Sequence, residues 1–296
     1  MKIDLSTLAP SVRQNWLQHA IAPRPIGLVS TIDGRGHVNL SPFSFFNLFS
    51  SNPPILIFSP ARRVRDNTTK HTLDNILEVA EVVINIVDDS MVQQVSLSSC
   101  EYPKGVDEFK MAGFKATPSE AVKPPRVAES KIQIECLVTE VKALGEEGGA
   151  GNLVICQVIL MHIADEILSN DGTMIDPQKM RHVARLGGDW YSRVDESNLF
   201  KVEKPNQKLG IGFPGLPVDI RQSSILSGNQ IAQLANVDVI PDFEPGFSDP
   251  HVKQIIQYFS SNPEEMELEL HRHAAYLLDK GMVREAWQVL LLSSNA

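Results

Sequence analysis

Apolar residues in the first two thirds of the chain come in short runs that are separated by turn signals. Residues 131–143 alternate apolar and polar side chains, less strictly near the end, as in a strand with one buried face. A second long run, residues 152–167, follows a Gly-rich segment at 145–151 that predicts a hairpin loop. Shorter runs predict four further strands, at residues 25–32, 37–40, 54–58 and 82–87.

The hydrophobic period changes at residues 69–79. Leu73, Ile76 and Leu77 fall on one face there at helical spacing, and residues 90–97 fit a second, short helix. Few helices among short strands that are joined by tight turns favour a β-barrel over a doubly wound sheet.

The pattern changes again near residue 200. Residues 201–248 are rich in Pro, Gly and polar residues and predict an irregular connector. Residues 249–296 show helical periodicity, with Asn262 able to cap a helix that has Pro263 at its first position. We therefore expect a barrel domain at residues 1–200, then the connector, then a C-terminal extension folded as a helical hairpin.

Composition and charge exclude several classes of protein. Of the 296 residues 43% are hydrophobic, which is too many for a disordered chain. The 27 Lys and Arg against 36 Asp and Glu give a net charge of −9, so we expect no nucleic-acid partner. Three scattered cysteines cannot form a disulfide scaffold or a CxxC zinc site. The sequence shows neither a signal-length nor a membrane-length apolar run, which predicts a cytoplasmic protein without a membrane partner.

The familiar short motifs of nucleotide and metal sites give little support to those functions. Residues 210–215 match GxGxxG, but Pro214 and Pro217 obstruct the helix that a dinucleotide fingerprint requires. The sequence contains no P-loop, HExxH or GxSxG motif, and its eight histidines are dispersed. We therefore expect no metal site and no nucleophilic hydrolysis.

Residues 39–47 (NLSPFSFFN) combine hydroxyls, amides and aromatic rings around a proline. Such side chains suit a flat heterocycle with polar edges, because apolar groups can stack on its faces while short polar groups bond its rim. The alternative is a barrel strand whose Phe45 and Phe46 fill the core.

Two further clusters follow. Residues 59–75 place four cations and three threonines before or at the start of the predicted helix, a combination that suits a phosphate group. A solvated basic loop is the alternative. Residues 181–193 hold paired glycines, two aromatic residues, a histidine and three arginines, and fit either a ligand-facing turn or a surface turn.

Together these clusters resemble one known family. IAPRPIGLVST at 21–31 and NLSPFSFFN at 39–47 are similar to the opening of the flavin reductase-like, FMN-binding split-barrel family. KHTLDNI at 70–76 resembles the K-D-T-x-x-N-I helix start of that family, with His71 in place of the usual Asp. RLGGDWY at 185–191 resembles the R-L-G-G-x-x-Y signature of one branch.

The resemblance covers about residues 15–195. It implies a mainly β fold, a six-stranded antiparallel split barrel with peripheral helices, which forms a homodimer with FMN at the subunit interface. Carried over motif by motif, it implies these flavin-binding residues: Arg24, Thr31, Ser41, Pro42, Phe43, Ser44, Ser59, Arg62, Lys70, His71, Thr72, Arg185 and Tyr191. Residues 41–44 would line the isoalloxazine ring, and Ser59, Arg62, Lys70 and Thr72 would hold the phosphate.

The implied activity is that of an FMN-dependent oxidoreductase. Hydride from NAD(P)H would reach the flavin and leave to an acceptor, and the cofactor would supply the chemistry. We therefore assign no catalytic acid or base. Two alternatives stay open: a non-catalytic flavin-binding barrel whose C-terminal extension recruits a partner, and a barrel of the pyridoxamine-phosphate oxidase type.

Overall fold

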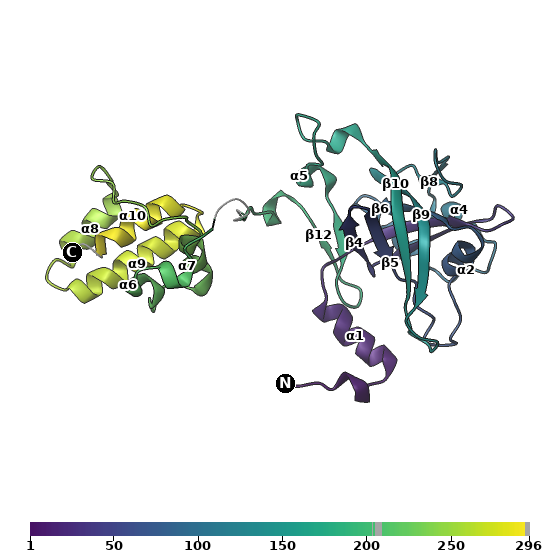
Figure 1. Cartoon of the computed structure of the whole chain (residues 1–296), viewed down its shortest axis with the longest axis horizontal. Helices are drawn as coiled ribbons and strands as arrows, with labels where there is room; N and C mark the ends of the chain where they lie inside the picture. The colour runs from purple at the N-terminus through teal and green to yellow at the C-terminus, as the bar shows by residue number, and fades with distance from the viewer. Residues whose placement is uncertain (203, 205–208, 294–296) are drawn as a thin grey trace. The chain divides into compact units, whose positions relative to one another are not determined.

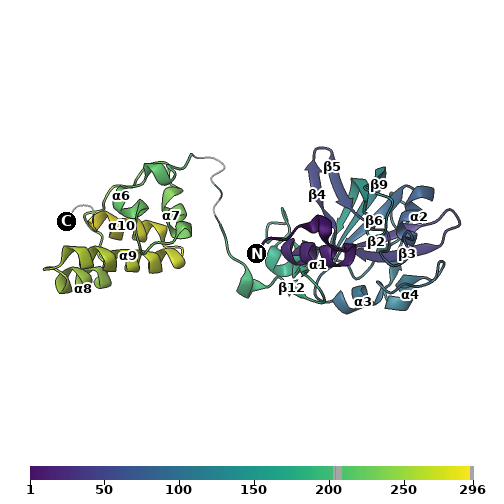
Figure 2. The same ribbon diagram turned by 90° about the horizontal axis from the view of Figure 1, so that it is seen from below.

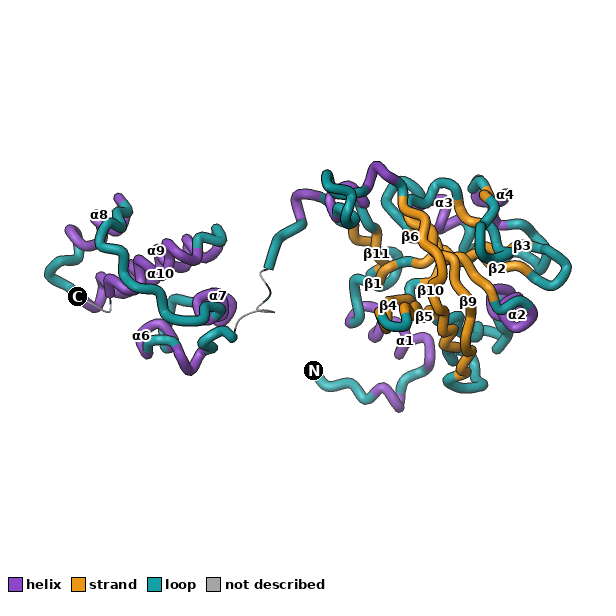
Figure 3. The backbone as a smooth tube through the Cα atoms, turned by 45° about the horizontal axis from the view of Figure 1, so that its top comes forward, coloured by secondary structure: helices purple, strands orange, loops and turns teal. Residues whose placement is uncertain are grey.

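The computed structural model describes residues 1–202, 204 and 209–293. The chain divides into two compact units, Met1–Phe200 and Lys201–Ala296 (Figure 1). The named strands all belong to the first unit, and the second is built from helices (Figure 3). Helices account for 33% of the chain and strands for 24%, so the expected mainly β class is wrong for the chain as a whole. The physical reason is that the residues after 200 add a helical core of their own.

Seven strands form the main sheet of the first unit, and every neighbouring pair is antiparallel. In spatial order they are β3 (Val38–Phe43), β2 (Gly27–Ile32), β6 (Glu81–Ile86), β9 (Ile132–Ala143), β10 (Asn152–Ile163), β5 (Pro54–Phe58) and β4 (Phe46–Ser51). The sheet thus has one strand more than the six that the resemblance implies, and the apolar runs of the sequence did not indicate β4. That strand has no buried residue, so its sequence lacks the alternation that marks a strand with one covered face.

The connection between β3 and β4 shows that this sheet closes on itself. These strands lie at opposite ends of the spatial order, yet only Ser44 and Phe45 separate them in sequence. Three Cα–Cα steps span at most about 11 Å, so the two edges of the sheet must approach each other. The backbone N–H of Ser59, just after β5, donates to the carbonyl of Phe45 at 2.9 Å and holds this junction.

Two smaller sheets and five helices surround the main sheet. The small sheets contain β1 (Arg24–Pro25), β11 (Val183–Arg185) and β12 (Tyr191–Arg193) in one, and β7 (Ala116–Thr117) and β8 (Arg126–Val127) in the other. The helices are α1 (Pro10–Ala20), α2 (His71–Glu78), α3 (Val92–Leu97), α4 (Glu108–Ala112) and α5 (Pro177–Met180). Figure 2 shows α3 and α4 close together beside β3, and α2 packs on β2 and β3.

The core of the first unit contains two of the three cysteines. Cys136 of β9 and Cys156 of β10 are fully buried, and all three thiols are free, as the sequence predicted. Burial raises the pKa of Cys136 to about 12, so this thiol stays protonated and inert at neutral pH.

The second unit differs from the expected connector and hairpin. Residues 201–248 contain α6 (Val218–Arg221) and α7 (Gly228–Ala235), whose apolar side chains share one core with the later helices. Those later helices are α8 (Pro250–Tyr258), α9 (Pro263–Asp279) and α10 (Val283–Ser293). α9 packs against α10, α7 and α8, so the hairpin is part of a larger helical unit. Sequence reasoning missed these helices because they have only four and eight residues, too few to show a helical period within a segment rich in Pro and Gly. No helix among the described residues combines the length and apolar character of a bilayer span.

The second unit should lose stability in mild acid because of His271. This side chain of α9 is 2% exposed, and the Ser223 hydroxyl lies 2.7 Å from its Nδ1. Burial lowers the pKa of His271 in the folded state, whereas the pKa of a histidine in an unfolded chain is about 6.5. The unfolded state therefore binds the proton more readily than the folded state. The contribution of neutral His271 to the unfolding free energy is fully present above about pH 6.5 and is lost as the pH falls through the pKa of the folded state.

Chemical unfolding from pH 8 to pH 5 tests this expectation. Trp287 is the single tryptophan after residue 200, and its burial makes its fluorescence a reporter of the second unit. The decrease in unfolding free energy should be smaller in His271→Gln than in the natural chain. An equal decrease in both proteins would show that another group is responsible.

Candidate functional site

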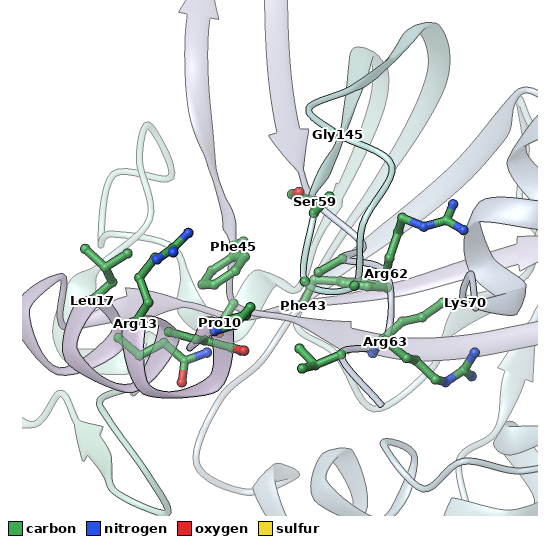
Figure 4. A pocket seen from close by; sticks show the side chains of 18 of the residues that line it. Pro10, Arg13, Leu17, Phe43, Phe45, Ser59, Arg62, Arg63, Lys70 and Gly145 are labelled. Atoms are coloured by element: carbon green, nitrogen blue, oxygen red, sulfur yellow. The ribbon is translucent and has the colours of Figure 1, made fainter. Parts of the chain in front are cut away.

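A cavity of about 870 Å³ lies in the first unit, at the junction of β3 and β4. One wall is α1, and the opposite side is formed by the loop after β5 and by Lys70 at the start of α2 (Figure 4). The loop between β9 and β10, residues 145–150, completes the lining. Phe43 and Phe45 lie between the α1 side chains and the cationic side (Figure 4).

The structure brings together seven of the thirteen residues that the resemblance implies. Those lining the cavity are Arg24, Pro42, Phe43, Ser44, Ser59, Arg62 and Lys70. Those outside its lining are Thr31, Ser41, His71, Thr72, Arg185 and Tyr191. The first two sequence clusters therefore meet at one cavity, and the third does not line it.

The β3–β4 junction supplies the aromatic part of the cavity. The ring of Phe43 is buried against Phe58, with 5.1 Å between ring centroids, and the Lys70 Nζ lies 5.2 Å from the Phe43 centroid. Phe45 is 42% exposed and faces the cavity, whereas Phe46 packs partly into the core. The alternative that both rings fill the core thus holds for Phe46 and is wrong for Phe45.

The basic loop after β5 is ordered by its own hydrogen bonds. Arg62 donates from Nε and Nη2 to the side chain and the carbonyl of Asn67, both at 2.6 Å. Arg63 donates to the Thr68 hydroxyl at 2.9 Å and pairs with Glu101 at 3.3 Å. Both guanidinium groups therefore have partners within the protein.

Lys70 differs from these arginines. Among the described residues its ammonium group has no hydrogen-bond acceptor and no salt-bridge partner. Burial, reinforced by the charge of Arg63, lowers the pKa of Lys70. An anion in the cavity would stabilise this charge.

The start of α2 adds backbone donors to this cation. Within the described part of the chain, the N–H groups of His71 and Thr72 donate no hydrogen bond, as is usual in the first turn of a helix. The Thr72 hydroxyl donates to Asn39 at 2.7 Å, and the Thr31 hydroxyl accepts from Asn75 at 3.2 Å. The hydroxyls of Thr31 and Thr72 thus serve buried contacts rather than the cavity.

Arg24 connects the third cluster to α1. Its guanidinium donates to the carbonyls of Gln18, Ile21 and Leu186, and its Nε is buried without a partner in the described structure. Burial, together with the nearby charge of Arg185, lowers the pKa of Arg24. This arginine ties the end of α1 to the turn between β11 and β12.

Arg185 and Tyr191 face each other on those two strands. The Arg185 guanidinium lies 4.6 Å from the Tyr191 ring centroid and donates to the Gly188 carbonyl at 2.7 Å. The pair supports the turn that Arg24 holds, and neither side chain lines the cavity.

Sequence reasoning missed two walls of the cavity. The α1 side chains that line it are Pro10, Arg13, Gln14, Leu17 and Gln18. Their positions 10, 13, 14, 17 and 18 share one helical face, but three of the five residues are polar, so no apolar period marks that face in the sequence. The loop at 145–150, expected to be a plain hairpin, also packs on the basic loop: Gly149 N–H donates to the Arg62 carbonyl at 3.0 Å, and a Cβ at Gly148 would lie 3.0 Å from the Arg63 carbonyl.

Gly187→Ala should displace α1 from its place beside the cavity. A Cβ at Gly187 would overlap the imidazole of His19. None of the side chains of α1 is buried, so little packing opposes displacement of this helix. We expect a loss of about 1–2 kcal/mol in folding free energy from this overpacking, and faster proteolysis within residues 10–20. His19→Ala in the same chain removes the clash and should restore protection; a double variant as sensitive as the single one would contradict this explanation.

The first unit closely matches known proteins. The profile of the flavin reductase like domain matches residues 19–183. An uncharacterized protein of Halalkalibacterium halodurans is 36% identical over 207 residues, covering 69% of this chain and 97% of that protein.

Solved structures extend the match to the fold. Nitrilotriacetate monooxygenase component B from Bacillus cereus superposes with a TM-score of 0.63 and is 27% identical, covering 68% of this chain and 98% of that one. The 2-nitrobenzoate 2-nitroreductase of Pseudomonas fluorescens has the same TM-score at 24% identity, covering 72% and 100%. The fold of the first unit is accordingly that of the flavin reductase-like split barrels, and a flavin-related oxidoreductase role is supported. With its profile match, its relatives and its closed antiparallel sheet in agreement, the chain belongs to the flavin reductase-like family.

Proposed function

We propose that this protein binds FMN in the cavity beside β3 and uses it to pass hydride from NAD(P)H to an acceptor. The observation that carries the proposal is Lys70, a half-buried cation at a helix start whose ammonium group has no hydrogen-bond acceptor and no salt-bridge partner in the described residues, although the charge of Glu101 partly offsets its desolvation. A charge that is partly removed from water without a bonded partner is costly, and groups perturbed in this way cluster at functional sites.

The phosphate end of FMN fits the start of α2. Lys70 directly precedes α2, and the N–H groups of His71 and Thr72 in the first turn donate no hydrogen bond within the described residues, so the positive end of the helix dipole lies next to this cation. Ser59 and the backbone of the basic loop lie on the same side of the cavity. Arg62 would act mainly by its charge, since Asn67 already occupies its donors.

The ring of the flavin fits the β3–β4 junction. Pro42, Phe43 and Phe45 give an apolar face, and Ser44 adds a short polar side chain at its edge. Bound FMN would supply the hydride chemistry. The protein would hold the ring against this junction, exclude water with α1, and leave the exposed face open for a nicotinamide.

We also propose that the molecule is a homodimer. Leu48 and Phe49 of β4 are 61% and 63% exposed, and Ile159 and Met161 of β10 are similarly uncovered in a single chain. Exposed apolar residues on a sheet favour association with a second copy. Sedimentation equilibrium should give twice the 32.7 kDa chain mass.

An absorbance spectrum tests the flavin proposal. The purified protein, or the protein after incubation with FMN and dialysis, should be yellow, and anaerobic NADH or NADPH should bleach the band. A colourless protein after dialysis would refute the proposal.

The second unit motivates a different candidate function. Residues 201–296 lie outside the matched domain and form a separate helical core, which suits a partner-recruiting module on a barrel that binds flavin without turnover. Rapid bleaching by a nicotinamide would exclude that reading, whereas a bound flavin that no nicotinamide reduces would favour it.

A further inference from the structure

A chain of buried hydrogen bonds lies beneath the start of α2. Glu108 of α4 is 4% exposed and accepts from the Asn39 side-chain amide at 2.8 Å and from the Leu40 N–H at 3.0 Å. Asn39 in turn accepts from the Thr72 hydroxyl at 2.7 Å. None of these side chains lines the cavity.

The chemistry of Glu108 fixes the direction of this chain. An ionised carboxylate only accepts hydrogen bonds, so Asn39 must turn its NH₂ group toward Glu108 and its carbonyl oxygen toward Thr72. The Thr72 hydroxyl then donates inward, because it has a single proton. The Thr72 hydroxyl is therefore not available to a ligand and instead anchors the first turn of α2.

The same chain fixes the position of the helix. Thr72 and Asn75, three residues apart on one face of α2, bond to Asn39 and Thr31. Asn39 and Thr31 are directly opposite each other on β3 and β2. Two tethers to one cross-strand pair determine both the rotation and the translation of the helix.

We propose that Glu108 is a positioning residue for phosphate recognition: through Asn39 and Thr72 it holds the first turn of α2, and with it Lys70, at the cavity. The inference rests on the proposed FMN function and adds a residue of α4 that lies outside the cavity. Lys70 is the residue just before α2, so a shift of the first turn moves the ammonium group together with the free N–H groups.

Glu108→Gln tests this role, with the FMN and riboflavin affinities as the measurement. Asn39 and Leu40 donate to different oxygens of Glu108, so a glutamine would turn its NH₂ group toward one of these two donors. If Asn39 reorients to face that NH₂ group with its oxygen, it no longer accepts from Thr72. We expect the preference for FMN over riboflavin to fall about five- to tenfold, the effect of one weakened hydrogen bond in the chain. Thr72→Val should give a similar fall, the two changes together should not add, and Thr72→Ser should retain the natural preference.

A matched control is Glu135→Gln. Glu135 of β9 is also buried and accepts from backbone N–H groups, of Glu120 and Ala121, but it belongs to another part of the sheet. This variant should lose stability while its preference for FMN stays within about twofold of the natural chain, since its hydrogen bonds hold a different loop.

Three outcomes would count against one of the two proposals. Equal losses for FMN and riboflavin in Glu108→Gln would overturn the inference and leave Glu108 a purely structural role. A stronger preference for FMN would overturn it too, because removal of a negative charge would then be the dominant effect. Failure of the natural chain to bind either flavin would instead refute the proposed function.

Discussion

Lys70→Met should weaken FMN binding by about 1.5–3 kcal/mol, the usual worth of a hydrogen bond to a charged group, and should change riboflavin binding much less. Methionine preserves the length and packing of the side chain beside Phe43 while removing the ammonium group. Riboflavin lacks the phosphate, so the difference between the two ligands isolates the charge at this position. Quenching of flavin fluorescence on titration with protein measures both affinities.

The same substitution should leave the ligand-free protein at least as stable as before. Desolvation of the half-buried Lys70 ammonium group, which has no hydrogen-bond acceptor in the described residues, costs free energy, and methionine removes that cost. Lys142→Met is the control, because Lys142 is an exposed lysine of β9 outside the cavity lining. Equal losses of FMN and riboflavin affinity in Lys70→Met would contradict the phosphate assignment.

Trp287→Ala should destabilise the second unit by about 3–5 kcal/mol, the range for a large aromatic residue removed from a core. Trp287 of α10 is 1% exposed and lies in the apolar core that α6 to α10 share. Its indole N–H is buried without a partner in the described structure, so part of the lost packing is offset by removal of that polar group. Loss of helical circular dichroism on heating measures the effect.

Flavin binding gives this prediction its control. Among the residues that the structure describes, those lining the candidate cavity all belong to the first unit, so Trp287→Ala should leave the FMN affinity unchanged. Trp287→Phe retains most of the volume and loses the N–H, and its destabilisation should be clearly smaller. If Trp287→Ala abolished flavin binding, the two units would have to fold as one cooperative system.

The strands that sequence reasoning found are those with a covered face. β9 and β10 show apolar residues at short intervals because one side of each packs into the core, and the predicted hairpin between them is present. β4 carries exposed apolar residues on both sides and was not distinguishable from a loop. The helices α6 and α7 were missed for a related reason, since their few turns are too short for a period to emerge.

The candidate site could be predicted where chemistry lies within one sequence segment. Pro42 to Ser44 and Lys70 were found because their segments concentrate unusual side chains. The lining by α1 depends on a contact across the fold, which no local pattern records. The inward turn of the Thr72 hydroxyl depends on Glu108, thirty-six residues away, and could be seen only once the strands were in place.

The short Ser44–Phe45 link has a consequence for how relatives can diverge. These two residues join β3 to β4, the two edge strands of the sheet, and they also line the cavity. An insertion between them would therefore separate these strands and at the same time change the contact with the flavin ring. We expect this segment to keep its length, while α1 and the 145–150 loop, which lie outside the main sheet, vary more. Differences among relatives in the molecules that reach the cavity should therefore arise from α1 and the 145–150 loop, while the Ser44–Phe45 link stays the same.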